Sequence, residues 1–163
     1  MDLIIADANI FVYLFKCSVL DNLIYSKHYR IKISTAVFNE LTAGNRIPKE
    51  YPTLRKIFLD IAHNHTTKTN IEIIDINVSL HNISAIEIFY ILSETGELDL
   101  GEIESIPLAT ELNGKFITND FDAITIANKI QSSLACPFKD FCVDLFAKQI
   151  INSTELEAIN NLL

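Results

Sequence analysis

The feature that most constrains the fold is a short apolar run near the N-terminus that ends in a carboxylate. Residues 3–6 are all apolar, Asp7 follows them directly, and residues 10–15 then show helical spacing. Such a run is typical of a strand buried on both faces of a parallel sheet. Because ligands bind at the carboxyl ends of these strands, Asp7 is well placed for chemistry. In the alternative interpretation, Asp7 or Asn9 only caps the following helix.

Length and charge limit the classes of protein that fit. The chain has 163 residues, 49% of them hydrophobic, and a formal net charge of −8. This size predicts a single domain, 1–163, and the negative charge argues against broad, sequence-blind affinity for nucleic acid. A nuclease stays possible if metal ions supply positive charge locally. No apolar run approaches the roughly 18 residues of a membrane span, so we expect a cytoplasmic protein without membrane contact.

Strand-like and helix-like segments alternate along the chain. Strands are expected at residues 31–33, 71–75 and 115–118, with a possible edge strand at 134–136, and residues 63–70 are expected to form a loop. Helices are expected at 10–15, 19–25, 36–43, 54–62, 78–92, from about 100 to 112, 123–130, 140–151 and 154–163. This alternation predicts a three-layer α/β/α fold around a parallel sheet of four to five short strands. Residues 131–163 would be a helical extension of the same domain.

Acidic residues are dense around the start of the helix expected near residue 100. Asp99 and Glu102 are three positions apart and should face one crevice, whereas Glu104 should not share it. In the alternative interpretation, these acids only stabilise the first turn of the helix through its dipole, whose positive end lies there. Pro107 lies too deep to be a first-turn proline, so we expect a kink or a late helix start there.

A second strand also ends in acids. Residues 115–118 lead into Asp120 and Asp122, as residues 3–6 lead into Asp7. In a doubly wound sheet these strand ends lie at one edge, so Asp7 and Asp120 should converge, with Glu40 and Glu102 arriving from adjacent helices.

Such a cluster of acids needs a cation or a bound proton. At about 5 Å and an effective dielectric of about 20, each pair of like charges costs on the order of 3 kcal/mol. Oxygen ligands without His or Cys suit Mg²⁺ or Mn²⁺, and Cys17, Cys136 and Cys142 contain no C-x-x-C pair for a thiolate zinc site. A divalent ion of this kind can activate water and stabilise charge on a phosphoryl group.

Together these motifs resemble the PIN-domain family over roughly residues 3–127. The resemblance rests on Asp7-Ala8-Asn9 after the first strand, Glu40 on the helix after the second, Gly101-Glu102 opening a helix, and Thr118-Asn119-Asp120 after a later strand. The separation of Glu102 and Asp120, 18 positions, is similar to that of the third and fourth acids of the family.

The resemblance implies a metal-dependent ribonuclease that uses Mg²⁺ or Mn²⁺ to hydrolyse RNA phosphodiester bonds. Asp7, Glu40, Glu102 and Asp120 would be the catalytic and metal-binding acids, with Asn9 and Asp122 as secondary metal or water contacts. Many members are toxins of toxin–antitoxin modules and form homodimers, which implies an antitoxin protein as a possible partner. The chain departs from the family pattern in two places, because Asn9 stands where some members carry a second Asp and Pro107 interrupts a helix that is usually Ala-rich.

A basic group follows Glu40 along the chain. Arg46, Lys49, Arg55 and Lys56 could flank the crevice and hold RNA phosphates, or could belong to a solvated loop. The distinction cannot be drawn from spacing, so both interpretations stay open.

Other classes of protein share single features with this sequence. A haloacid-dehalogenase-like phosphohydrolase also begins with a strand-end Asp, but its pattern is Asp-x-Asp and it needs a catalytic Lys. A catalytically idle PIN-like domain that binds a protein partner is a further alternative. A response-regulator receiver is disfavoured because it needs adjacent acids near the first strand. The string His63-Asn64-His65 lacks the surrounding ligands of an HNH nuclease.

Overall fold

The computed structural model describes residues 1–63 and 68–163, and its core is a five-stranded sheet. The strands are β1 (Asp2–Ala6), β2 (Tyr29–Ser34), β3 (Ile71–Ile74), β4 (Lys115–Thr118) and β5 (Ala135–Pro137). All neighbouring pairs are parallel, and the order across the sheet is β3-β2-β1-β4-β5. The predicted central parallel sheet is therefore confirmed. Residues 64–67, which include most of the His-Asn-His string and half of the loop expected at 63–70, lie outside the described residues.

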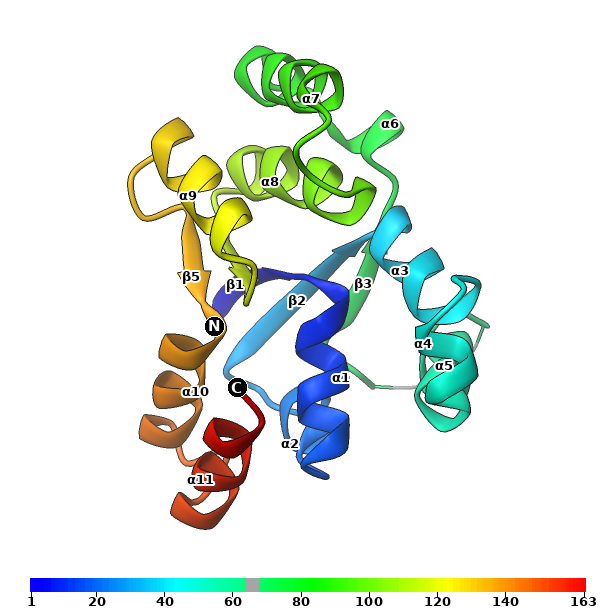
Figure 1. Cartoon of the computed structure of the whole chain (residues 1–163), viewed down its shortest axis with the longest axis vertical. Helices are drawn as coiled ribbons and strands as arrows, with labels where there is room; N and C mark the ends of the chain where they lie inside the picture. Colours follow the sequence, from blue (N-terminus) through cyan, green and yellow to red (C-terminus); the bar gives the residue numbers. More distant parts are fainter. Residues whose placement is uncertain (64–67) are drawn as a thin grey trace.

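Helices cover both faces of this sheet (Figure 1). One face carries α1 (Ala8–Lys16), α2 (Leu20–Ile24), α3 (Thr35–Thr42), α5 (Pro52–His63), α10 (Phe138–Ala147) and α11 (Ser153–Leu162). The other carries α7 (Ile83–Thr95), α8 (Leu100–Leu112) and α9 (Phe121–Ile130). The short helices α4 (Ile47–Glu50) and α6 (Ile76–Ser79) lie at connections. The expected three-layer α/β/α architecture is confirmed.

The apolar run that opened the sequence behaves as a strand buried from two sides. In β1, Ile4 and Ala6 belong to the hydrophobic cluster under α1, whereas Ile5 belongs to the cluster under α8. Ile5 and Ala6 are fully buried. Side chains of successive strand residues point to opposite faces, so a continuous apolar run is needed to fill both layers.

The helix expected at residues 78–92 is confirmed over residues 83–92 and wrong before them. The chain instead forms α6 and α7, separated at Leu80 and His81. Asp75 caps α6, and Asn82 accepts a hydrogen bond from the Ser84 N–H to cap α7. The apolar spacing runs through the break, so periodicity alone could not locate it.

A carboxylate from a distant helix stabilises this break. Glu111 of α8 accepts the N–H of His81 at 3.0 Å and the N–H of Asn82 at 2.8 Å. These two N–H groups have no intrahelical acceptor at the break, and the Glu111 carboxylate supplies one.

Three prolines lie within helices. Pro48 lies in the first turn of α4 and Pro52 begins α5, where a proline needs no N–H partner. Pro107 lies inside α8, which begins at Leu100, so the expected late start of this helix is wrong.

The helix expected at 140–151 begins two residues earlier and ends at Ala147.

The C-terminal helices pack onto the same core as the first strand. Phe138, Phe141 and Leu145 of α10 and Ile159 of α11 belong to the cluster that also holds Ile4. The hydrophobic core therefore includes residues that follow β5, the last strand along the chain.

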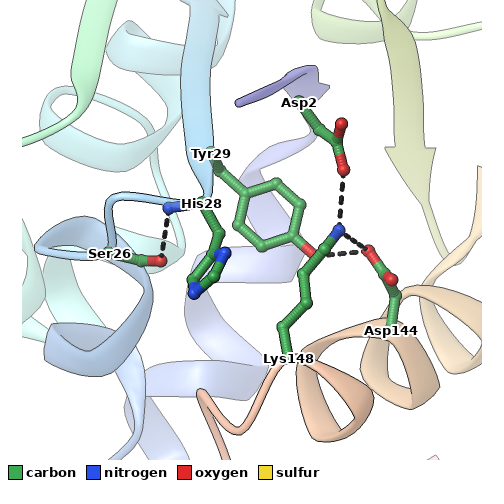
Figure 2. A network of polar contacts seen from close by, with 6 residues as sticks. All are labelled: Asp2, Ser26, His28, Tyr29, Asp144 and Lys148. Carbon is green, nitrogen blue, oxygen red and sulfur yellow. Dashed lines mark hydrogen bonds and ion pairs between the residues drawn. The ribbon is translucent and has the colours of Figure 1, made fainter.

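A polar network fastens α10 to the amino-terminal edge of the sheet (Figure 2). The Lys148 ammonium donates to Asp2 at 2.7 Å, to Asp144 at 2.6 Å and to the Tyr29 hydroxyl at 3.1 Å, and that hydroxyl donates to Asp144. Burial, followed by the bond to Asp144, raises the pKa of Tyr29. This network links the starts of β1 and β2 to residues more than a hundred positions away in sequence.

A cleft of about 940 Å³ opens at the same edge and is lined by Asp2, Tyr29, Lys115, Cys136 and Asp144, among others. It lies at the starts of the strands, away from the strand-end acids.

Cys142 is buried, and Cys17 and Cys136 are half-buried free thiols. In the described ranges, no helix is long and apolar enough to cross a membrane.

Candidate active site

Two predicted acids lie at the carboxyl ends of adjacent strands. Asp7 follows β1 and caps α1, where its Oδ1 accepts the Ala8 N–H at 2.8 Å. Asp120 follows β4 and caps α9, where its Oδ1 accepts the Ala123 N–H at 2.9 Å. Because β1 and β4 are neighbours, both acids are held at one edge of the sheet. Asp7 and Asp120 therefore cap their helices and also lie at the carboxyl edge of the sheet, because each helix begins directly after its strand.

Thr118 links these two positions. Its buried hydroxyl donates to Asp7 Oδ2 at 3.4 Å and accepts the Asp120 N–H at 3.1 Å. The sequence singled out Thr118 only as part of a motif, and its position as the last residue of a strand was the available signal. The hydroxyl holds the second oxygen of Asp7 toward β4.

Glu102 reaches the same edge from the first turn of α8. It forms a capping box with Asp99: the Glu102 N–H donates to Asp99 Oδ1 at 2.9 Å, and the Asp99 N–H donates to Glu102 Oε2 at 3.2 Å. Glu102 is only 5% exposed, whereas Asp99 is exposed. The reciprocal bonds fix the carboxylate of Glu102 over the start of its helix.

Gly101 explains how Glu40 approaches this turn. A Cβ at position 101 would lie 3.3 Å from Val37 Cγ2 and 3.5 Å from Glu40 Oε2, both on α3. The absence of a side chain therefore lets the first turn of α8 pack closely against the carboxylate of α3. The Gly-Glu pair serves both the packing and the acidic site.

The acids raise one another's pKa. Burial, then Asp99 and Glu40, raise the pKa of Asp7 from 3.8 to about 7. Burial, then Asp99, Asp7 and Asp120, raise the pKa of Glu102 from 4.5 to about 8. The pKa of Glu40 is raised by burial and Asp99, while Arg46 lowers it. The structure thus brings Asp7, Glu40, Glu102 and Asp120 into one electrostatic unit, and adds Asp99 to it.

The donor set suits a hard divalent cation held partly by water. Within residues 1–63 and 68–163, no three His, Cys, Asp or Glu side chains are arranged closely enough to form a ready metal site. However, Glu102 and Asp120 each commit one oxygen to a helix-capping N–H, and Asp7 commits one oxygen to the Ala8 N–H while the other accepts the Thr118 hydroxyl at the long distance of 3.4 Å. Buried carboxylates with raised pKa values favour a cation nearby, and Mg²⁺ tolerates few protein ligands because it keeps several waters.

The remaining site candidates divide into several groups. Asn9 Oδ1 accepts a hydrogen bond from Arg46 Nη2 at 2.8 Å. Asp122 lies exposed in the first turn of α9 and lines a small pocket with Glu97 and Lys129. In the described part of the chain, Asp122 shares no hydrogen bond with the acidic cluster.

The basic residues after Glu40 also differ from one another. Arg55 Nε donates to the carbonyl of Thr42 at 2.9 Å, so part of its guanidinium closes the end of α3. Lys49 and Lys56 are exposed on α4 and α5.

Glu104 accepts the Ala36 N–H at 3.1 Å and therefore points away from the acids, as its spacing predicted.

Fold and site together define a parallel α/β protein with an acidic site at the carboxyl edge of its sheet. The family model DUF3368, described as a PIN domain, matches residues 3–134, so the chain belongs to the PIN-domain family. This confirms the resemblance found in the sequence. It also leaves the haloacid-dehalogenase-like alternative without support.

Solved structures show distant similarity. A PilT N-terminus domain protein from the archaeon Sulfolobus solfataricus P2 aligns with 16% identity and a TM-score of 0.49, covering 87% of this chain and 92% of that one. The crystal structure of VapBC2 from Rickettsia felis, bound to a DNA fragment from its promoter, aligns with 18% identity and a TM-score of 0.48, covering 83% and 98%. No curated protein matches the sequence.

Proposed function

We propose that the chain is a metal-dependent endoribonuclease that hydrolyses RNA phosphodiester bonds. The observation that carries this proposal is the pair Asp7 and Glu102, which are 4% and 5% exposed and belong to one group of acids at the carboxyl edge of the sheet. Burying unpaired carboxylates is costly, so a cluster of them is expected where a cation will bind. Members of the PIN-domain family are typically nucleases, which agrees with this chemistry.

In this proposal Asp7, Glu40, Glu102 and Asp120 hold Mg²⁺ or Mn²⁺, with Asp122 as a secondary contact. The secondary metal or water contact expected of Asn9 is not part of the proposal, because its Oδ1 accepts a hydrogen bond from Arg46. The ion would supply positive charge that activates water and stabilises the phosphoryl group. The chain's own residues do the positioning: Thr118 orients Asp7, and the capping bonds fix Glu102 and Asp120.

Glu102 is suited to handle a proton in the reaction. The capping box with Asp99 holds its carboxylate in a fixed position for that role. Glu102 or Asp120 would accept the proton of the attacking water, and the 3′ oxygen of the cut strand would leave.

RNA would be held by the basic residues beside the acids. We assign this role to Arg46, Lys49, Arg55 and Lys56, all on the segment that follows Glu40. A locally positive rim is needed because the formal net charge of the chain is −8.

The proposal includes partners and location. We infer that the protein is the toxin of a toxin–antitoxin pair, that it forms a homodimer and that it acts in the cytoplasm, where its RNA substrate lies. Ile83, Tyr90 and Ile91 of α7 are 74%, 62% and 60% exposed, and an apolar helix face of this kind favours protein contact. Residues 1–163 would act as one domain.

A second candidate is a catalytically idle PIN-like domain that binds a protein partner. It is favoured by the absence, in the described residues, of three closely placed metal ligands. The same α7 face would then be its main functional surface.

One experiment separates the two candidates. Purified protein is incubated with RNA and Mg²⁺ or Mn²⁺, next to Asp7→Asn and to Asp60→Asn, which removes an equal charge from the exposed side of α5. Cleavage by the wild type and by Asp60→Asn, but not by Asp7→Asn, supports the ribonuclease. Equal cleavage by Asp7→Asn would refute it, and absence of cleavage by the wild type would favour the binding module.

A further inference from the structure

One hydrogen bond joins the first turn of α1 to the segment after α3. Asn9 stands two positions after Asp7, and its Oδ1 accepts a hydrogen bond from Arg46 Nη2 at 2.8 Å. Arg46 is the residue that precedes α4, at the end of the connection from the helix of Glu40. This contact fixes a cation next to the acidic site.

The other partner of Arg46 is weak. Arg46 Nη1 lies 3.9 Å from Glu50 Oε2, and their side chains are 52% and 53% exposed. Exposed pairs of this kind contribute about 0–1 kcal/mol and are screened by salt. A guanidinium has five N–H donors, so Arg46 keeps donors beyond the one that Asn9 receives.

The charge of Arg46 reaches the acids. Arg46 lowers the pKa of Glu40 against the raising effects of burial and Asp99. The hydrogen bond to Asn9 places the same guanidinium at the first turn of α1, the helix that Asp7 caps.

The type of side chain at position 9 decides whether the positive charge of Arg46 is neutralised. An amide oxygen holds a guanidinium in place without neutralising it, whereas a carboxylate at position 9 would pair with Arg46 and add negative charge beside Asp7. Arginine presents its donors in a planar fork that matches phosphate oxygens. An Arg46 that is held by a neutral amide and paired only weakly with Glu50 is thus equipped to bind a phosphodiester group.

We propose that Asn9 is a positioning residue that holds Arg46 beside Glu40, and that Arg46 binds the RNA phosphate next to the bond that is cut. This inference rests on the proposed ribonuclease function. It changes the role of Asn9, because the amide oxygen serves Arg46 and not the metal ion.

Binding is measured by fluorescence anisotropy with a labelled single-stranded oligoribonucleotide in EDTA, so that no cleavage occurs. The variants are Asn9→Ala, Arg46→Ala, the double variant, and Arg30→Ala as a matched control. Arg30 is an exposed arginine near the start of β2, at the opposite edge of the sheet.

Arg46→Ala should weaken binding roughly tenfold and reduce the slope of log affinity against log salt by about one, because one phosphate contact is lost. Asn9→Ala should weaken binding severalfold with an unchanged slope, because the charge stays. The double variant should bind no more weakly than Arg46→Ala, since both act through one contact. Arg30→Ala should bind like the wild type.

A second measurement separates this role from metal binding. Calorimetric titration with Mn²⁺ should give the same affinity for Asn9→Ala and the wild type. Asn9→Asp, which keeps an acceptor oxygen but neutralises Arg46, should weaken RNA binding and flatten the salt slope. It also serves as the second variant if Asn9→Ala does not fold.

Two results would overturn the inference: RNA affinity unchanged in Arg46→Ala, or lost Mn²⁺ affinity with normal RNA affinity in Asn9→Ala. Failure of the proposed function is a different result, namely no RNA cleavage by the wild type in Mg²⁺ or Mn²⁺. The anisotropy measurements do not depend on cleavage, so the two failures are distinguishable.

Discussion

Replacing Asp7 by asparagine should stabilise the metal-free protein, and the gain should grow with pH. In the folded protein, burial and the neighbouring charges of Asp99 and Glu40 raise the pKa of Asp7 to about 7, against an ordinary value of 3.8. A group that holds its proton more tightly when folded stabilises the fold fully below pH 3.8, and this contribution is lost as pH rises through 7. Asparagine does not ionise, so it avoids this loss.

The size of the effect follows from the shift of the pKa. Each unit corresponds to about 1.4 kcal/mol, so the shift from 3.8 to about 7 corresponds to a total of about 4 kcal/mol. Between about pH 5 and about pH 8, the part still to be lost is on the order of 2–3 kcal/mol. The amide oxygen of asparagine can still accept the Ala8 N–H, so the cap of α1 is kept.

Urea denaturation in EDTA at the two pH values measures this directly. The difference in unfolding free energy between Asp7→Asn and the wild type should increase toward alkaline pH. Asp60→Asn, an exposed carboxylate outside the cluster, should show no such increase. A difference that stays constant with pH, or a variant less stable than the wild type at about pH 8, would show that the acids are not in a desolvated, mutually repelling cluster.

The other predictions concern ligands and the C-terminal segment. Mg²⁺ or Mn²⁺ should raise the melting temperature of the wild type and leave that of Asp7→Asn nearly unchanged, as followed by calorimetry; equal shifts would contradict metal binding at the acids. Arg55→Ala combined with Lys56→Ala should weaken RNA binding in the anisotropy assay at unchanged Mn²⁺ affinity, and loss of the Arg55 bond to Thr42 should also cost about 1 kcal/mol in urea denaturation. Unaltered RNA affinity would remove both residues from the site. Removing residues 135–163 should unfold the chain, as seen by circular dichroism, because the core that they complete would be exposed; a cooperatively folded fragment would contradict this.

The sequence predicted those features that depend on neighbouring residues. The apolar run at residues 3–6 forms β1, and the helix expected at 36–43 forms as α3, with Ser34 as its N-cap. Gly96 ends α7 in the left-handed conformation with φ of 67°, which suits a glycine. Each of these choices is made by backbone hydrogen bonds and sterics within a few residues, so the pattern contains enough information.

Site predictions from spacing alone were less complete. The spacing predicted that Asp99 and Glu102 share a crevice and that Glu104 points elsewhere, and their hydrogen bonds agree. Spacing gave no sign that Asn9 would bind Arg46, because these residues are 37 positions apart and meet only when α1 and α4 are placed. The acid-rich first turn is present, because Asp99 and Glu102 form a capping box at the start of α8; the catalytic role of the acids stays a proposal.

By itself the sequence determined the strands, the approximate positions of most helices and the acids that follow β1 and β4, because periodicity and capping act locally. Only the tertiary structure decided how far each carboxylate is buried. It also decided where the helix is interrupted between α6 and α7, beside Glu111, and how Lys148 pairs with Asp2 at the opposite edge of the sheet. Those outcomes depend on the approach of segments far apart in the chain, where the packing of whole helices fixes positions to within the length of a hydrogen bond. Local patterns do not specify distances of that kind.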